Sequence, residues 1–440
     1  MESSLPLRTV PLRKRSGIGA ITLLLIVLVF QLTVLPDTLG IKVLGRVFNA
    51  IALASFLLGG IYALFSGRTA KIPRVYLISV LLVVVGFAIN IARSLSPESV
   101  GAASALLPWL AAIAVPYMKS FSLERSWRLY YRFMLWGAVV SAIEYAAVFS
   151  GLLTPTAIDT DRGLFLKGVF SIFFGLSDGE VHYRMYGLFA EPGTYAMFLI
   201  PAIAYAWLHG KKWPAAFFLA CFYLTDSLGG ILGLFVMGVT YLFWRSRSRP
   251  VGLLVGVLLA MGAAYSASGS LRERYDQKNN SRVVREDNVT LFRDNFVSVV
   301  TANPLGLPLN GRTLSELDNA TSNYIGSNFE IYTVFVKGGI IACVGYTALL
   351  LWMLVQNGWY LLAGDRDPER AAALISLPAM LLFTLQRETV LSSALFGFLY
   401  VQPLMSIFMA RIAASGRRRA KRRQRHDALL PGQIAIMEGG

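Results

Sequence analysis

Two apolar stretches of this chain each carry a cation and a carboxylate seven residues apart. The first contains Arg184 and Glu191, and the second contains Glu330 and Lys337. Seven residues make about two helical turns, so both members of a pair would share one face of a continuous helix. A charged side chain inside a membrane costs about 2–3 kcal/mol even on the gentler insertion scales. Such pairs are therefore expected to face protein or a water-filled cavity.

Gly187 and Pro192 determine the local shape expected around the first pair. Pro192 disfavours helical geometry at Glu191, which predicts a kinked or half-unwound segment, and Gly187 would let a ligand approach closely. The functional interpretation is a cavity near the outer membrane surface, lined by a cation and a carboxylate. In the structural alternative, Arg184 reaches lipid headgroups while Glu191 pairs with it or with another cation. For the second pair, the alternative is a structural ion pair.

Further arginines lie in polar stretches on the same predicted side of the membrane. Arg387 precedes Glu388 in a short turn, and three others lie in a long polar stretch. The planar fork of arginine suits bidentate binding of phosphate, so converging arginines would hold an anion such as a diphosphate. A solvated loop of mixed charge is the alternative for any single residue. The predicted substrate-binding residues are Arg184, Arg282, Arg285, Arg293, Asn328 and Arg387.

The composition indicates an integral membrane protein. Of 440 residues, 55% are hydrophobic and only 15% are charged, whereas a soluble domain carries about 25% charged residues. The net charge of +16 resides mainly in short connections between apolar blocks, a pattern that orients helices and requires no nucleic acid. Both cysteines fall in apolar segments, so no disulfide is expected. His209 and His426 lie among predicted cytoplasmic charges and His182 alone lies outside, so no His/Cys metal centre is expected. We expect no cofactor and no metal.

The apolar blocks predict an all-α polytopic fold with about 12 transmembrane helices. Basic connections alternate with the blocks, which predicts a bacterial inner-membrane protein with both termini in the cytoplasm. Residues 1–16 would form a cytoplasmic segment, 17–412 the transmembrane domain, and 413–440 a basic, disordered tail. The periplasmic loops would be 150–184 and 267–328, the larger one between the ninth and tenth spans. The predicted spans are 17–35, 43–65, 75–92, 102–118, 129–149, 185–207, 214–225, 228–244, 250–266, 329–356, 371–386 and 390–410.

Two segments depart from this simple alternation. The stretch 214–244 is short for two spans, and Thr225-Asp226-Ser227-Leu-Gly-Gly230 interrupts it. Irregular polar backbone at membrane depth is tolerated only where it is buried in protein or lines a cavity. We predict two short helices that meet at a polar elbow beside a cavity; one long tilted helix is the alternative. Within the first loop, residues 164–176 predict an interfacial helix on the outer leaflet.

The motifs, taken in order, resemble those of Wzy-type O-antigen and exopolysaccharide polymerases, which belong to the O-antigen ligase/polymerase superfamily. The pattern Arg184-x-x-Gly187-x-x-x-Glu191-Pro192 looks like the outer end of a central helix in that family. The elbow resembles a Ser- and Gly-rich segment, although Leu228 stands where the family commonly has arginine. Asn303-Pro-Leu-Gly306 resembles a turn of the large outer loop, and Ser327-Asn328 followed by Gly338-Gly339 resembles the start of the next helix.

This resemblance implies a metal-independent glycosyltransferase at the outer face of the inner membrane. Its donor and acceptor would be undecaprenyl-diphosphate-linked glycans, and a flippase and a chain-length regulator are possible partners. Glu191 is the first choice for general base and Glu330 the second, with Arg184 stabilising the leaving diphosphate; His182 is a third choice of base, or a surface residue. An O-antigen ligase is an alternative, but ligases usually carry histidine where this chain has Ser327. A flippase or transporter of lipid-linked glycans and a non-enzymatic export component also remain alternatives.

Overall fold

The computed structural model describes a little under half of the chain. The described residues are 72–94, 106–114, 123–160, 163–169, 172–177, 180–181, 184–189, 192–246, 297, 300–307, 330–362, 367–384 and 407–408. Three predicted spans, 17–35, 43–65 and 250–266, lie outside them, as does nearly all of 390–410. The structure is compared below with the predictions for the remaining spans.

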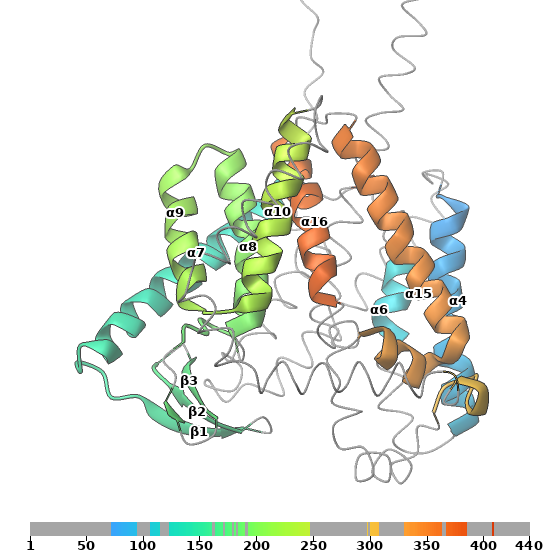
Figure 1. Cartoon of the computed structure of the whole chain (residues 1–440), viewed down its shortest axis with the longest axis horizontal. Coiled ribbons are helices and arrows are strands. Elements are labelled where there is room, and N and C mark those ends of the chain that lie inside the picture. Colours follow the sequence, from blue (N-terminus) through green and yellow to red (C-terminus); the bar gives the residue numbers. More distant parts are fainter. Residues whose placement is uncertain are drawn as a thin grey trace, which may run out of the picture.

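Each remaining predicted span coincides with a helix (Figure 1). Three segments are long and apolar enough to cross a membrane, namely Arg74–Arg93, Trp127–Phe149 and Val334–Leu362. Helices α8, α9 and α10 are apolar but shorter. The helical membrane architecture is therefore confirmed for this part of the chain, while the total of about 12 spans stays a prediction. The helices are α4 (Arg74–Ser94), α6 (Leu106–Ala114), α7 (Leu123–Phe149), α8 (Pro192–Leu208), α9 (Lys212–Leu224), α10 (Leu228–Ser246), α15 (Glu330–Leu362) and α16 (Pro368–Thr384).

The long helices turn apolar side chains outward and keep polar ones inside. On α4, Ile78 is 54% exposed, whereas Ser79 and Asn90 are buried. On α15, Val355 is 66% exposed and Asn357 is buried. In water, exposing these apolar side chains would be unfavourable. In a bilayer it is not, because lipid is as apolar as the exposed side chains. The surface is therefore suited to a bilayer.

The helices pack in two groups that are joined by contacts of α16 and α10 with α15 (Figure 1). Helices α4, α6 and α15 form one group, and α7 to α10 with α16 form the other. Helix α8 is central to the second group, because every residue from Tyr195 to Ala206 is buried. Aromatic rings fill its contact with α7, where Trp127 stacks on Tyr205 at 5.6 Å between ring centroids.

A small antiparallel sheet replaces the interfacial helix predicted at 164–176. Strands β1 (Thr156–Thr160), β2 (Gly163–Lys167), β3 (Ile172–Ser177) and β4 (Glu180–Val181) pair in chain order. The prediction was wrong because an apolar run of thirteen residues fits a strand hairpin as well as a short helix. Phenylalanine and isoleucine in this run favour strands, and in the hairpin neighbouring strands satisfy each other's backbone groups.

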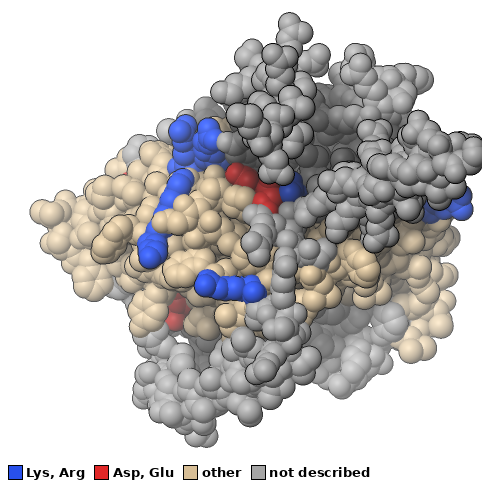
Figure 2. Space-filling model, turned by 90° about the horizontal axis from the view of Figure 1, so that it is seen from above, with Lys and Arg blue, Asp and Glu red and all other residues tan. Residues whose placement is uncertain are grey.

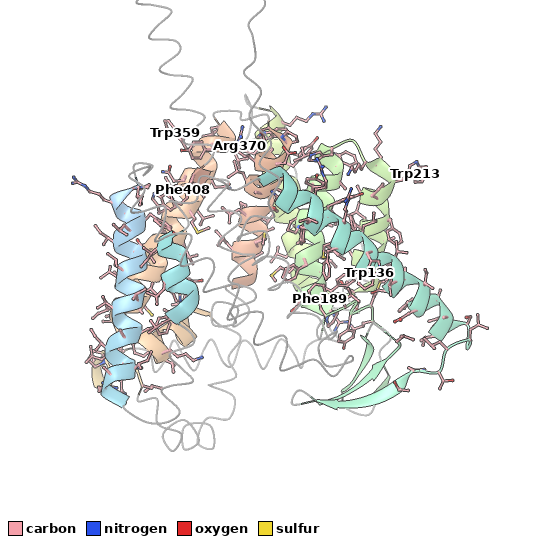
Figure 3. All side chains as sticks on the ribbon, turned by 180° about the vertical axis from the view of Figure 1, so that it is seen from behind. Trp136, Phe189, Trp213, Trp359, Arg370 and Phe408 are labelled. Carbon is pink, nitrogen blue, oxygen red and sulfur yellow. The ribbon has the colours of Figure 1, made fainter. Side chains whose placement is uncertain are left out.

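The two ends of the helical assembly differ in character. The α8–α9 connection, the end of α10 and the start of α16 lie at one end, where Figure 3 shows Trp213 and Arg370. The predicted cytoplasmic connections that the structure describes thus come together. The sheet, the α9–α10 connection and the beginning of α15 lie at the opposite end (Figure 1). We call these the basic end and the elbow end.

Candidate functional site

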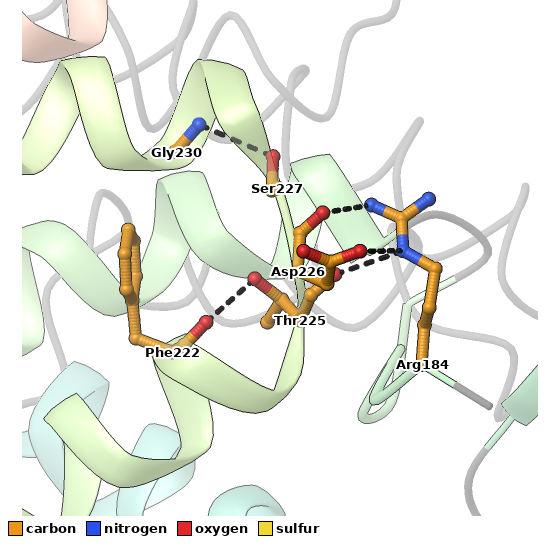
Figure 4. Close-up of polar contacts among 6 residues, drawn as sticks. All are labelled: Arg184, Phe222, Thr225, Asp226, Ser227 and Gly230. Atoms are coloured by element: carbon orange, nitrogen blue, oxygen red, sulfur yellow. Dashed lines mark hydrogen bonds and ion pairs between the residues drawn. The ribbon is translucent and has the colours of Figure 1, made fainter. Parts of the chain in front are cut away.

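Arg184 lies at the elbow end and is held by the connection between α9 and α10 (Figure 4). Its Nε donates to the carbonyl oxygen of Thr225 at 3.1 Å, and its Nη2 donates to that of Asp226 at 2.6 Å. The carboxylate oxygen Oδ2 of Asp226 is 4.0 Å from Nε. The side chains of Arg184 and Asp226 are both partly exposed. The guanidinium therefore brings a positive charge to the surface while fixing the elbow.

The elbow, residues 225–227, separates two helices as predicted, and the alternative of one long helix is wrong. Thr225 is buried, and its hydroxyl donates to the carbonyl of Phe222 at 2.7 Å. Ser227 Oγ accepts from the backbone N–H of Gly230 at 3.1 Å and so caps the start of α10. Thr225 thus pairs a backbone carbonyl at the end of α9, and Ser227 pairs a backbone N–H at the start of α10. The cavity predicted beside the elbow stays a prediction.

Asp226 adopts a left-handed backbone conformation, with φ of 46°. Outside glycine this conformation is uncommon, and it costs about 1–2 kcal/mol. Aspartate tolerates it better than most residues. The contacts of Arg184 to the carbonyls of the elbow offset this cost. Backbone strain of this kind is concentrated at functional sites, which motivates a functional role for the elbow.

The segment around Gly187 is not helical, in agreement with the unwinding predicted before Pro192, so the predicted span 185–207 begins as a helix only at Pro192. Helix α8 begins at Pro192, so Arg184 lies outside it and shares no helical face with Glu191. Gly187 has φ of +60°, and a Cβ there would lie 2.8 Å from the ring of Tyr195. The space that a side chain at position 187 would occupy is therefore filled by the ring of Tyr195, and the close approach of a ligand to Gly187 stays a prediction. Pro192 at the first helical position explains why the helix starts there.

The second predicted pair lies on the first part of α15, which contains a break. Glu330 begins the helix, and Lys337 is half-buried two turns later. Gly339 has φ of 65° and ψ of −167°, which interrupts the helical hydrogen bonding. Both predicted residues precede the break. The side chain of Glu330 lies outside the described residues, so its pairing with Lys337 stays a prediction.

A turn formed by residues 303–307 closes the break. The N–H of Leu307 donates to the carbonyl of Val336, and the N–H of Ile340 donates to the carbonyl of Pro304, each at 2.9 Å. These groups would otherwise lose their partners where the helix is interrupted. Irregular backbone inside a membrane is stable only when it is satisfied in this way. The 303–307 turn is therefore an integral part of the helical core.

Helix α4 supplies side chains to the same junction. Arg93 donates through Nη2 to the carbonyl of Gly306 at 2.6 Å. Asn90 is buried, and its Nδ2 contacts three carbonyl oxygens, those of Leu307 (2.9 Å), Val336 (3.3 Å) and Lys337 (3.1 Å). One amide thus joins α4, the turn and α15. We call this arrangement the Asn90 junction.

Glycines allow the backbones of the Asn90 junction to approach closely. A Cβ on Gly86 would lie 2.5 Å from the carbonyl oxygen of Gly338, and one on Gly339 would lie 2.4 Å from the backbone of Leu305. Gly306 has φ of +93°, and its Cβ would meet the carbonyl oxygen of Val336 at 2.8 Å. Any larger residue would force these segments apart.

Four motifs identified in the sequence therefore meet in two pairs. The Arg184 motif contacts the 225–230 motif, and the 303–306 motif contacts the Gly338-Gly339 motif. Both pairs lie at the elbow end (Figure 1). The remaining predicted residues lie outside the described part of the chain, and their positions stay predictions. They are His182, Glu191, Arg282, Arg285, Arg293, Asn328 and Arg387.

Sequence inspection passed over several residues that the structure singles out. Asn90 and Arg93 lie at the end of a predicted span without any motif, and their partners are more than two hundred residues away. Glu144 is buried on α7, and it is the single acid in the predicted span 129–149. An ionisable residue in a span is a functional candidate by default, so that signal was present for Glu144.

Comparison with protein-family models and with curated proteins found no match for this chain. Within the described residues, no group of three or more His, Cys, Asp or Glu side chains is placed to hold a metal ion. The absence of a metal requirement stays a prediction. The functional assignment therefore depends on the geometry of the elbow end.

Proposed function

We propose that this chain polymerises undecaprenyl-diphosphate-linked oligosaccharide repeat units at the periplasmic face of a bacterial inner membrane. The observation that carries the proposal is the pairing of the four motifs at the elbow end. Segments far apart in sequence are built there into two ordered junctions inside an otherwise apolar helical assembly. Backbone irregularity and a half-buried guanidinium are costly at membrane depth, which supports a functional reason for both.

In the proposed reaction, an acceptor sugar hydroxyl attacks the anomeric carbon of the donor glycan. The new glycosidic C–O bond forms as the bond from that carbon to the undecaprenyl diphosphate breaks, and the diphosphate leaves with the bonding electron pair. The hydroxyl proton passes to a carboxylate, with Glu191 as first choice and Glu330 as second. No nucleotide and no redox partner takes part.

The role of Arg184 in this reaction is electrostatic. Its charge is fixed by the elbow carbonyls, so little reorganisation is needed when negative charge develops on the leaving diphosphate. Arg282, Arg285, Arg293 and Arg387 would add further positive charge from the loops, and Asn328 a hydrogen bond. Asp226 would limit the field of Arg184 through its carboxylate, 4.0 Å away.

The test is the lipid-linked glycan profile of the native bacterium deleted for this gene and complemented with variants. Arg184→Ala and Glu191→Ala should leave single repeat units on the carrier and abolish the polymer ladder. Asp226→Asn keeps the backbone carbonyls that Arg184 contacts, so polymer should persist. Lys212→Ala removes an exposed charge at the basic end and serves as the matched control.

Each outcome of this experiment has a defined meaning. Full-length polymer from Arg184→Ala at normal protein level contradicts the assigned role of Arg184. Long chains that accumulate on the carrier in the deletion strain indicate a ligase instead of a polymerase. Repeat units trapped on the cytoplasmic side indicate a flippase. Protein level and thermal unfolding in detergent are measured for every variant, so that a folding defect is recognised.

A further inference from the structure

Helix α4 finishes at the elbow end with an arginine that has no role in the proposed reaction so far. Arg93 lies in the last turn of this helix and is exposed. Its Nη2 donates to the carbonyl oxygen of Gly306 at 2.6 Å. A guanidinium carries five N–H donors, and this contact engages one edge of the fork. The other edge is therefore available to a ligand.

The carbonyl that holds Arg93 is itself fixed. The N–H of Gly306 donates to the carbonyl of Asn303 at 3.0 Å, which closes the turn. Gly306 packs so tightly on Asn90 that a Cβ there would lie 3.0 Å from Nδ2 of the amide. Asn90 precedes Arg93 by three positions, so both lie on one face of α4. The Asn90 junction thus determines where the guanidinium is held.

The charge of Arg93 is not offset by the part of the chain that the structure describes. No carboxylate of that part forms an ion pair with its guanidinium. The nearest acid in the sequence, Glu98, follows five positions later and lies outside the described residues. Arg184 differs, because the carboxylate of Asp226 is 4.0 Å from its Nε. At the basic end, which Figure 2 views, acidic side chains also lie beside basic ones at one point of the described surface.

The position of Arg93 along its helix corresponds to the depth of lipid headgroups. Arg93 closes the segment Arg74–Arg93, which is long and apolar enough to cross a membrane. The charge bias that orients helices places cations on the cytoplasmic side, so an arginine at the predicted outer end requires another reason. A favourable interaction with the helix dipole is the structural reason, and a lysine would serve it equally. The planar fork of arginine adds the ability to bind phosphate.

The proposed reaction uses two lipid-linked substrates, and each carries a diphosphate. The donor loses its diphosphate, whereas the acceptor keeps its own. The acceptor hydroxyl that reacts is on the glycan, so the acceptor diphosphate lies a repeat unit away from the reacting atoms. Two separate cationic sites are therefore needed. Arg184 is held by the α9–α10 connection of one helix group, and Arg93 ends α4 in the other (Figure 1).

We propose that Arg93 binds the diphosphate of the lipid-linked acceptor, while Arg184 acts on that of the donor. This inference rests on the proposed function and adds a second anion site to it. The guanidinium keeps one edge on the carbonyl of Gly306 and presents the other to phosphate oxygens. The Asn90 junction thereby fixes the acceptor relative to the helices, and α4 takes part in substrate binding.

The proposal is tested by lipid binding to the full-length protein in a neutral detergent. Undecaprenyl diphosphate is titrated, and bound lipid is counted by native mass spectrometry. The wild-type protein should bind one lipid at each site and thus two per chain. Arg93→Gln should weaken one of these binding events roughly tenfold, and Arg184→Gln the other. A glutamine at position 93 can still donate to the carbonyl of Gly306, so the contact between α4 and the turn is kept.

Arg74→Gln is the matched control, because it removes the same charge from an exposed position at the opposite end of the same helix. It should change neither binding event by more than about twofold. Thermal unfolding without added lipid identifies any variant that fails to fold. Arg93→Lys is the second variant for that case. It keeps the charge but loses the planar fork, so it should also weaken one binding event.

The outcomes separate this inference from the proposed function. Unchanged binding by Arg93→Gln, together with a loss in Arg184→Gln, would overturn the role of Arg93 and leave the proposed function standing. Failure of the wild-type protein to bind undecaprenyl diphosphate would overturn both. Complete displacement from the Arg93 site by an equal concentration of dioleoyl phosphatidylglycerol would show an ordinary phospholipid site, and displacement by equal inorganic diphosphate a free anion site. Either result would overturn the acceptor assignment.

Discussion

The buried amide of Asn90 contacts backbone groups from two other segments of the chain. In lipid, an unmade hydrogen bond has no water to replace it, so a missing partner costs more than in a solvated loop. Arg184 likewise donates hydrogen bonds to backbone carbonyls, those of the elbow, but its side chain is partly exposed. Of the two, Asn90 is expected to have the larger effect on stability and Arg184 the larger effect on activity.

Replacing Asn90 by alanine should lower the free energy of unfolding by about 1–3 kcal/mol, because three carbonyl oxygens lose a donor. Thermal unfolding in detergent measures the change, and limited proteolysis should show faster cleavage near residues 301–307. Ile78→Ala, at an exposed position of the same helix, is the control and should change stability by less than about 0.5 kcal/mol. Equal stability of the two variants would mean that the junction contributes nothing.

The sequence indicated some of these residues and not others, for a physical reason. Arg184 stood out because a charge in an apolar stretch is costly wherever the chain folds. Asn90 is an ordinary polar residue near the end of an apolar run, and its importance depends on partners 217 and 246 positions away. Periodicity and composition describe local sequence and therefore contain no signal for such a contact.

At the scale of single elements, the break in helix α15 depends on the backbone conformation of Gly339. An alanine there would adopt φ of +65°, and its Cβ would lie 2.4 Å from the backbone of Leu305. Gly339→Ala should lower the free energy of unfolding by at least about 2 kcal/mol, since strain and steric displacement add. Thermal unfolding in detergent is the measurement.

Gly358 on the same helix provides an internal control for this prediction. A Cβ there would meet nothing within 4 Å, so Gly358→Ala should be neutral or stabilising by up to about 1 kcal/mol. If both alanine variants behave alike, the break at Gly339 is not a fixed feature of the helix. An opposite sign for the two changes is the expected result.

The described helices were predictable with their ends displaced by up to seven residues, and the sheet was not predictable. Long apolar stretches have no alternative to a helix in a membrane, because every backbone group must find a partner within the segment. Outside the apolar core, residues 163–177 can also satisfy their backbone groups by pairing as strands. They form the hairpin of β2 and β3 instead of the predicted helix. The start of α8 was misplaced by seven residues for a similar reason, since the stretch before Pro192 bonds to the end of α9 through Met185 and Leu224.

For the whole molecule, the two ends should lie on opposite sides of a membrane. Single cysteines at Lys212→Cys and Leu152→Cys, in a chain whose Cys221 and Cys343 are replaced by alanine, report this directly. Leu152 follows α7 and is 85% exposed, so an impermeant maleimide should label it in intact spheroplasts. Lys212→Cys should react only after permeabilisation. Labelling of both from the same side would contradict the proposed orientation and the proposed function with it.

The grouping of basic connections at one end was predictable, because the charge bias acts on each connection separately. The pairing of the four motifs was not, since a single sequence gives their order but no distances between them. The sequence supplied the order of the motifs, and the folded helices supplied the contacts between them. Four of the predicted substrate-binding arginines, Arg282, Arg285, Arg293 and Arg387, lie outside the described residues.

The Asn90 junction also has a consequence for synthesis of the protein in the cell. Asn90 leaves the ribosome long before residues 307, 336 and 337, whose carbonyls it contacts. Until those residues are synthesised, the Asn90 amide of a nascent chain lacks the carbonyl oxygens with which it pairs in the finished protein. A chain that stops before α15 would retain that defect permanently. Membrane proteases that survey unassembled helices would then have a means to distinguish truncated copies from finished ones.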